Sequence, residues 1–156
     1  MAKKTLAMKL LESHDIVFKV YEYPESERDA ETIAGLLGVS PDRLFKTLVA
    51  VREGKKHLLV MLPGSHQLDL KKLAKELGEK KVKLATHAEA EKLTGLQVGG
   101  ISPLALMNRG FSVILDESAF QHDSILVSAG KKGINLELNP KDLREITEAL
   151  LLDVKA

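Results

Sequence analysis

The apolar positions of this chain recur with two spacings, and each spacing predicts a different kind of element. Leu70, Leu73, Ala74 and Leu77 are three and four residues apart, which places them on one face of a helix. The same spacing, read with the residues that start and stop helices, predicts helical segments at 6–11, 30–37, 41–44, 69–77 and 87–93, and a last helix that begins at Asn139-Pro140 with Leu143, Ile146 and Leu150 facing inward.

Strands are predicted where apolar residues alternate with others or form short uninterrupted runs. Ile16, Phe18 and Val20 occupy every second position. With the apolar runs, this pattern predicts strands at residues 16–20, 45–52, 57–62, 82–84, 111–115, 125–128 and 134–138. Short turn segments, 53–56 and 130–133, join two pairs of these strands into hairpins. We therefore expect a mixed α/β fold, with helices around a mixed sheet, rather than an all-parallel doubly wound sheet.

The composition limits the class of protein and is consistent with a mixed α/β fold. A chain of 156 residues with 44% hydrophobic and 29% charged residues is expected to form one domain, spanning residues 1–156, with a substantial core. The net charge of +1 means that any contact with nucleic acid would depend on a local basic patch. The absence of cysteine excludes disulfides and thiolate chemistry. Because no apolar run suits a signal peptide or a membrane span, we expect a cytoplasmic protein without a membrane partner.

The histidines and serines form no convincing catalytic or metal-binding motif. His66 with Asp69, and His87 with Glu91, have spacings that two ligands on a helix could use, but no third ligand accompanies either pair. The chain also lacks the Gly-x-Ser-x-Gly motif of a nucleophilic serine. We therefore expect no metal, no cofactor and no serine nucleophile.

Lys46 and a lysine-rich segment each allow two interpretations. Lys46 begins an otherwise apolar strand, so it is either a solvated lysine at the strand end or a cation that points into a cleft, where it could bind a phosphate or a carbonyl. The most basic part of the chain contains Lys71, Lys72, Lys75, Lys80, Lys81 and Lys83. Such a run is usually the solvated face of a helix, but it could also follow a nucleic-acid backbone.

The segment 98–103 combines two glycines with a proline. Gly99 and Gly100 allow unusual backbone angles and a close approach by another group, and Pro103 stiffens the end of the segment. The segment is therefore either a tight connection between packed elements or a loop that presents several N–H groups to an oxygen atom.

Four segments, taken in order, resemble the YbaK family, whose members are free-standing relatives of the editing domain of bacterial prolyl-tRNA synthetases. These segments are Phe45-Lys46-Thr47-Leu48, residues 67–74, residues 94–104 and Val127-Ser128-Ala129-Gly130-Lys131-Lys132-Gly133. The similarity runs from about residue 6 to residue 150. It implies a barrel-like, mostly antiparallel mixed sheet surrounded by helices. It also implies an aminoacyl-tRNA deacylase that acts on proline tRNA carrying cysteine, with Cys-tRNA(Cys) as an alternative substrate.

The resemblance also implies roles for particular residues. The Gly99-x-x-x-Pro103 loop would hold the aminoacyl ester through its backbone N–H groups, which makes Gly99, Gly100, Ile101, Ser102 and Pro103 candidate site residues. Lys46 would position the terminal adenosine or its phosphate.

Four further positions bear on the aminoacyl pocket. Ser128 and Tyr23 fall where the family has pocket residues. Asn135 stands where the family often has an aspartate, and Asp29 lies near the position of its pocket phenylalanine. Both departures bear on which amino acid the pocket prefers.

The implied mechanism needs little from the protein, because the substrate supplies the nucleophile. The cysteinyl thiol would attack its own ester carbonyl and leave as a cyclic thioester, while the protein holds the ester and stabilises the oxyanion. One alternative is a deacylase for Ala-tRNA(Pro) that uses water or the tRNA 2′-hydroxyl. Another is a non-catalytic module that binds tRNA or a synthetase. The expected partners are mischarged tRNA and prolyl-tRNA synthetase.

Overall fold

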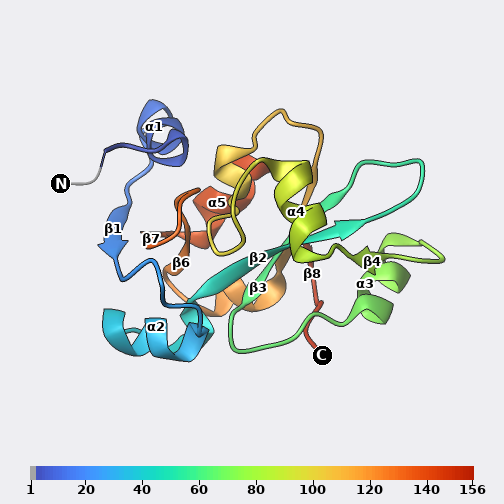
Figure 1. The fold of residues 1–156 in the computed structure, drawn as a ribbon, viewed down its shortest axis with the longest axis horizontal. Coiled ribbons are helices and arrows are strands. Elements are labelled where there is room, and N and C mark those ends of the chain that lie inside the picture. The colour runs from blue at the N-terminus through green and yellow to red at the C-terminus, as the bar shows by residue number, and fades with distance from the viewer. Residues whose placement is uncertain (1–2) are drawn as a thin grey trace.

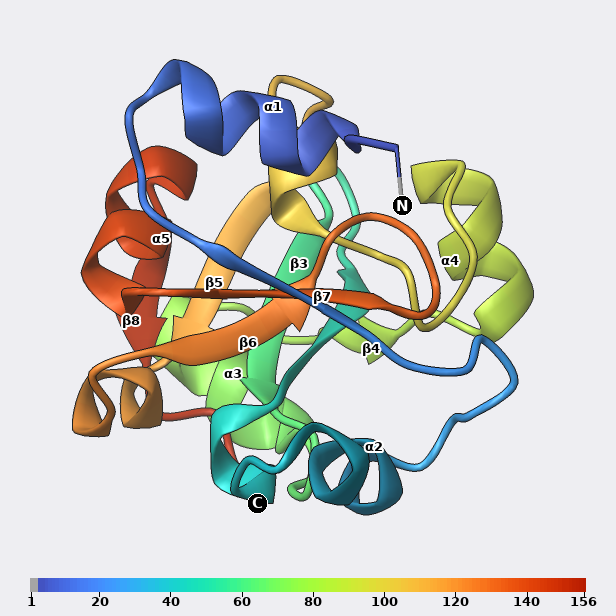
Figure 2. The same ribbon diagram turned by 90° about the vertical axis from the view of Figure 1, so that its left-hand side faces the viewer.

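The computed structural model describes residues 3–156, and Figures 1 and 2 show their arrangement from two sides. The α-helices are α1 (Leu6–Ser13), α2 (Ala30–Leu37), α3 (Leu70–Leu77), α4 (His87–Thr94) and α5 (Pro140–Thr147). The strands are β1 (Lys19–Glu22), β2 (Phe45–Val51), β3 (Leu58–Pro63), β4 (Lys83–Leu84), β5 (Ser112–Asp116), β6 (Ile125–Ser128), β7 (Ile134–Leu138) and β8 (Leu150–Leu152). Short 3-10 helices are η1 (Pro41–Arg43), η2 (Pro103–Ala105) and η3 (Glu117–Gln121).

The strands form two sheets of mixed character. In the larger sheet, ordered β4-β2-β3-β5-β8, the pairs β4-β2 and β2-β3 are antiparallel, whereas β3-β5 and β5-β8 are parallel. The smaller sheet, β1-β7-β6, is antiparallel throughout. The mixed, mostly antiparallel class predicted from the sequence is therefore confirmed, and both predicted hairpins, β2-β3 and β6-β7, are present.

The expected barrel-like closure is not found in the part of the chain that the structure describes. The two sheets meet at one isolated bridge, between Leu44 and Leu126. Directly after Leu44 the chain pairs with β3, beginning with Phe45 opposite Pro63, so β2 forms no ladder with β6. The molecule thus has two sheets, joined by one bridge and packed against each other in a shared core, rather than one closed barrel.

The helix signals in the sequence correspond to real caps. The Asp69 side chain accepts a hydrogen bond from the Lys72 N–H at the start of α3. Thr86 and Glu89 form the capping box predicted for α4. Leu150 was wrongly expected to face inward on the last helix: Glu148 adopts a left-handed conformation (φ 55°) that ends α5, and Leu150 begins β8 with 48% of its surface exposed.

β3 is the centre of the core. All six of its residues are buried, so it packs on both faces of the larger sheet. Met61 on one face belongs to the cluster that β6, β7, α1 and α5 cover, while Leu58, Val60 and Leu62 on the other pack near Leu73 of α3. None of the helices formed by residues 3–156 is both long enough and apolar enough to cross a membrane.

Candidate functional site

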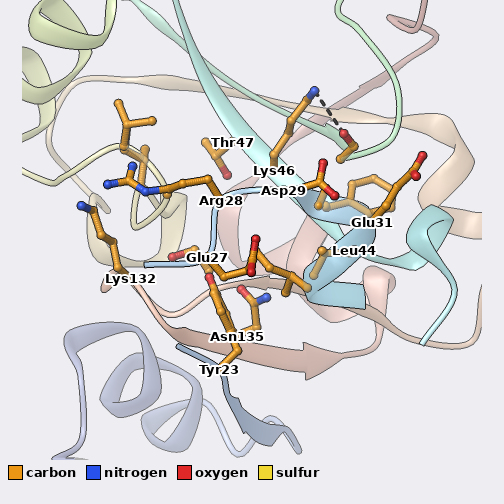
Figure 3. A pocket seen from close by; sticks show the side chains of 18 of the residues that line it. Tyr23, Glu27, Arg28, Asp29, Glu31, Leu44, Lys46, Thr47, Lys132 and Asn135 are labelled. Carbon is orange, nitrogen blue, oxygen red and sulfur yellow. Dashed lines mark hydrogen bonds between the residues drawn. The ribbon is translucent and has the colours of Figure 1, made fainter. Parts of the chain in front are cut away.

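A cavity of about 570 Å³ lies beside the start of β2, close to the corner where the two sheets meet (Figure 3). One wall consists of strand ends and the loop before η2; the other consists of the connection from β1 to α2. The strand wall contributes Leu44, Phe45, Lys46, Thr47, Leu48, Gly64, Ser65, Val98, Gly99, Ile101, Ser128, Lys132 and Asn135. The connection wall contributes Tyr23, Glu25, Glu27, Arg28, Asp29, Ala30, Glu31 and Ile33, and His87 lies at the start of α4.

Lys46 is a half-buried cation that faces this cavity rather than a solvated lysine at a strand end. Its Nζ donates a hydrogen bond of 3.4 Å to the carbonyl oxygen of Gly64, drawn as the dashed line in Figure 3. Burial lowers the pKa of Lys46 below its usual value. Among residues 3–156 it forms no ion pair, so its charge is available to a ligand.

The glycine loop brings Gly99 and Ile101 to the cavity lining, whereas Gly100 does not line the cavity. The Gly100 N–H is already donated to the Gln97 carbonyl oxygen at 2.8 Å. The N–H groups of Gly99 and Ile101 have no hydrogen-bond partner in the described chain, and both residues line the cavity. Any oxygen held by this loop would therefore contact the Gly99 and Ile101 amides.

Gly100 serves close packing. A Cβ atom built on Gly100 would lie 2.9 Å from the backbone nitrogen of Lys132 and 3.1 Å from the carbonyl carbon of Lys131, so only glycine fits here. Gly99, with φ +93°, adopts a conformation that other residues rarely tolerate. The two glycines thus press the loop against the β6-β7 turn while its exposed side faces the cavity.

Two further residues of the predicted motif lie behind the cavity. Ser102 and Pro103 are buried and do not line it. The Ser102 Oγ accepts a hydrogen bond of 3.2 Å from the Leu104 N–H, and Pro103 begins η2. Both residues are placed to stiffen the end of the loop rather than to contact a ligand in the cavity.

The β6-β7 hairpin supplies a polar patch to the cavity lining. Ser128 and Asn135 are opposite each other in the antiparallel register, so their side chains lie on the same face of the small sheet. The Ser128 Oγ accepts a hydrogen bond of 3.1 Å from the Gly130 N–H. The Asn135 side chain is buried to 5% exposure but makes no hydrogen bond within residues 3–156, which leaves its amide directed at the cavity.

Tyr23 lies at the junction of the two walls. Its backbone N–H donates to the Gly133 carbonyl oxygen at 2.9 Å, which ties the end of β1 to the β6-β7 turn. Burial raises the pKa of its hydroxyl, so the phenol remains protonated and can donate a hydrogen bond.

Of the connection wall, the sequence indicated only Tyr23 and Asp29, both through the family resemblance, and it gave no role to the charged residues beside them. Glu25, Glu27, Arg28, Asp29 and Glu31 all line the cavity. The available signal was a dense run of charges directly before a helix N-cap. Asp29 is that cap: its Oδ2 accepts from the N–H and the hydroxyl of Thr32, at 3.0 and 2.8 Å, and these bonds lower the pKa of Asp29.

The lining offers binding groups rather than a nucleophile or a metal site. In the described part of the chain, no three His, Cys, Asp or Glu side chains cluster as metal ligands would. No hydrogen bond there joins a cavity serine or threonine to a histidine, which would be needed to activate a hydroxyl. The arrangement can hold a polar oxygen with two amides, one ammonium group and one side-chain amide.

Comparisons with known proteins agree with one another. The aminoacyl-tRNA editing domain family matches residues 24–146. An Enterococcus faecalis protein, provisionally named the Cys-tRNA(Pro)/Cys-tRNA(Cys) deacylase EbsC, is 40% identical over 154 residues, which cover 97% of this chain and 93% of that protein. The multifunctional Ser/Thr-tRNA deacylase ProXp-y of Escherichia coli K12 is 27% identical, over 94% of this chain and 89% of its own.

A solved structure extends the likeness to the fold. A protein described provisionally as a trans-editing enzyme for prolyl-tRNA synthetase superimposes with a TM-score of 0.83 at 29% identity. The match covers 97% of this chain and 95% of that one.

Proposed function

The chain belongs to the aminoacyl-tRNA editing domain family, and from that membership we propose that it is a trans-acting deacylase whose main substrate is proline tRNA mischarged with cysteine. The activity at the coarser level, aminoacyl-tRNA deacylation, follows from the family and from relatives that match nearly the whole chain. The choice of cysteine is supported by the name of the 40% identical relative. The protein would act in the cytoplasm beside prolyl-tRNA synthetase, which makes the mischarged product.

One observation supports this mechanism: unpaired N–H groups and a lysine belong to the cavity lining, but no activated nucleophile is found there among the described residues. Gly99, Ile101 and Lys46 line a cavity with no Ser-His or metal arrangement within the described residues, and the N–H groups of Gly99 and Ile101 have no partner there. Such a site can stabilise a tetrahedral oxyanion and position an ester, but it does not supply the attacking atom. Such a site suits a substrate that carries its own nucleophile.

The proposed reaction is an intramolecular acyl transfer. The cysteinyl sulfur bonds to the ester carbonyl carbon, and the bond from that carbon to the ribose oxygen breaks. The thiol proton moves to the departing ribose oxygen, which leaves free tRNA and a cyclic thioester. In the tetrahedral intermediate the Gly99 and Ile101 amides hold the oxyanion, while Lys46 holds the terminal nucleotide. The Tyr23, Ser128 and Asn135 side chains shape the space around the amino acid.

The decisive experiment is a deacylation panel of Cys-, Ala-, Ser- and Thr-tRNA, each with and without prolyl-tRNA synthetase. We expect Cys-tRNA(Pro) to be released fastest, and replacement of the thiol by a hydroxyl in Ser-tRNA to reduce turnover to near background. Undiminished release of seryl-tRNA would contradict thiol assistance. Preferred release of alanine would instead favour water or the tRNA 2′-hydroxyl as the nucleophile.

The panel also separates an enzyme from a binding module. The variants Lys46→Ala and Gly100→Ala should both reduce deacylation strongly. If the wild-type protein binds tRNA but releases no amino acid, and the variants lose only binding, then the chain is a non-catalytic module.

A further inference from the structure

A second concave surface lies beside α3. It is a groove of about 360 Å³ between α3 and the segment that leads into β4. Figure 1 shows α3 and β4 together at one end of the molecule. The groove is lined by Leu70, Lys71, Ala74, Lys75, Glu79, Lys80, Lys81 and Val82. We refer to Lys71, Lys75, Lys80 and Lys81, all of them exposed, as the groove lysines.

The groove lysines carry charge that nothing in the described protein neutralises. None of the four forms an ion pair within residues 3–156. The one carboxylate in the groove, Glu79, is already paired with Lys55 at 2.6 Å and with Arg52 at 3.3 Å. Lys55 lowers the pKa of Glu79, so that carboxylate stays ionised within its own pair and leaves the lysines uncompensated.

The close spacing of Lys71 and Lys75 does not serve the stability of α3. Lys71 and Lys75 are four residues apart on the same helix face, a spacing at which like charges destabilise a helix. By contrast Lys72, one position away, pairs with Asp153 at 3.1 Å and donates to the Lys155 carbonyl oxygen at 2.8 Å. The lysine that supports the fold is therefore distinct from those that line the groove.

The strand register shows how far the groove lies from the cavity. Lys83 of β4 is opposite Val51, which lies five residues along β2 from Lys46, or about 17 Å at strand spacing. Lys83 is exposed, and only the short segment 84–86 separates it from His87 at the cavity. Duplex nucleic acid carries about one phosphate charge per 1.7 Å of its axis, so a strand whose end occupies the cavity would present many phosphates at this distance.

We propose that the groove lysines bind the phosphodiester backbone of the tRNA acceptor stem while the 3′ end occupies the cavity. The inference rests on the proposed function, since it places the same substrate. Ammonium groups on flexible stems act as point charges for phosphates. The groove has no aromatic side chain to stack on bases, so its contacts are with backbone phosphates rather than with base edges. The protein would hold acceptor stems of different sequence similarly.

The test compares two variants that each lose four positive charges. The first replaces the four groove lysines with glutamine. The matched control replaces four exposed lysines on other elements: Lys3, Lys9, Lys19 and Lys141. Binding of uncharged tRNA is measured over a salt series, which requires no catalysis and so does not depend on the proposed reaction. Each lost phosphate contact reduces the log–log salt slope by about 0.9, so we expect a reduction of about 3 to 4 in the groove variant.

The control should keep nearly the wild-type slope, and the groove variant should bind at least tenfold more weakly at low salt. The deacylation rates then show whether the groove variant has lost tRNA docking or has a damaged cavity. The groove variant should lose kcat/KM on full-length Cys-tRNA(Pro) but retain it on the cysteinyl ester of adenosine, which is too small to reach the groove. Equal slopes for the two variants would overturn the proposal. So would an equal loss on both substrates, or a loss seen only when prolyl-tRNA synthetase is present, which would assign the groove to the synthetase.

Discussion

The two walls of the cavity differ in how their groups are held. On the strand wall, Lys46 and Asn135 belong to paired strands and are at least half-buried. On the connection wall, Glu25, Arg28 and Asp29 are exposed on the segment between β1 and α2 (Figure 3). Interactions of half-buried groups are weakly screened, whereas exposed charges are screened by water and salt. The strand wall is therefore suited to act on the ester, and the connection wall to influence how the substrate approaches.

The largest effect should come from the cation on the strand wall. Lys46→Ala should lower kcat/KM for Cys-tRNA(Pro) by about 100-fold, equivalent to about 2.7 kcal/mol of transition-state stabilisation. The melting temperature should change little, because the Lys46 Nζ makes one long hydrogen bond within the described protein. Arg28→Ala removes an exposed cation from the other wall and should change kcat/KM by less than about threefold. Equal losses in the two variants would remove the distinction between the walls.

The next effect concerns the packing that supports the loop amides. Gly100→Ala places a methyl group 2.9 Å from backbone, so the loop must move away from the β6-β7 turn. We expect a loss of about 1–3 kcal/mol in unfolding free energy and of about tenfold or more in kcat/KM. Gly35→Ala in α2 is the control: nothing lies within 4 Å of its Cβ, so it should stabilise by about 0.5–1 kcal/mol. Chemical denaturation and deacylation rates measure both variants.

The strand wall was also the part of the site that could be predicted from the sequence. Lys46, Gly99, Ile101, Ser128 and Asn135 of this wall were singled out and all line the cavity, as does Tyr23 of the connection wall. Periodicity marks strands, and the motifs lie at strand ends or turns whose partners are close in sequence. Gly100, Ser102 and Pro103 were singled out too, but they pack behind the loop. A motif shows that a backbone shape is required without showing which of its atoms face a ligand.

The rest of the site depends on contacts between distant segments. The connection wall reaches the cavity because β1 pairs with β7, where Tyr21 lies opposite Asn135, and no local pattern specifies that pairing. The division into two sheets could not be predicted for a similar reason. Only the full set of strand partners shows that the chain pairs with β3, and not with β6, after Leu44. The end of α5 was misjudged because Glu148, not a glycine, adopts the left-handed cap.

A smaller effect is expected at Asn135, whose amide has no protein partner. Asn135→Ala should leave the unfolding free energy within about 0.5 kcal/mol of wild type, yet lower kcat/KM about fivefold if the amide bonds to the substrate. Ser128→Ala, on the neighbouring strand, should show the opposite balance. It breaks the hydrogen bond from the Gly130 N–H, at a cost of about 0.5–1.5 kcal/mol in stability. A stability loss at Asn135 would show that its amide supports the fold instead.

The smallest effect should come from Asp29 on the connection wall, and it should depend on pH. Hydrogen bonds from the Thr32 hydroxyl and N–H lower the pKa of Asp29 below 3.8, so its carboxylate binds protons less readily in the folded state than in the unfolded chain. Its stabilising contribution is therefore complete above the unfolded pKa and is lost as the pH falls through the folded value.

Asp29→Asn keeps an oxygen that can cap α2 but removes the charge. Its melting temperature should be slightly below that of wild type at neutral pH, and the difference should vanish as the pH falls through the depressed pKa of Asp29. Asp29→Ala removes the cap itself, so at neutral pH its melting temperature should fall further below that of wild type than the melting temperature of the asparagine variant does. Deacylation at neutral pH should stay within about twofold of wild type for Asp29→Asn, because an exposed charge on this wall is screened. A tenfold loss of turnover with an unchanged melting temperature would mean that Asp29 contacts the substrate, and the connection wall would then share in the chemistry.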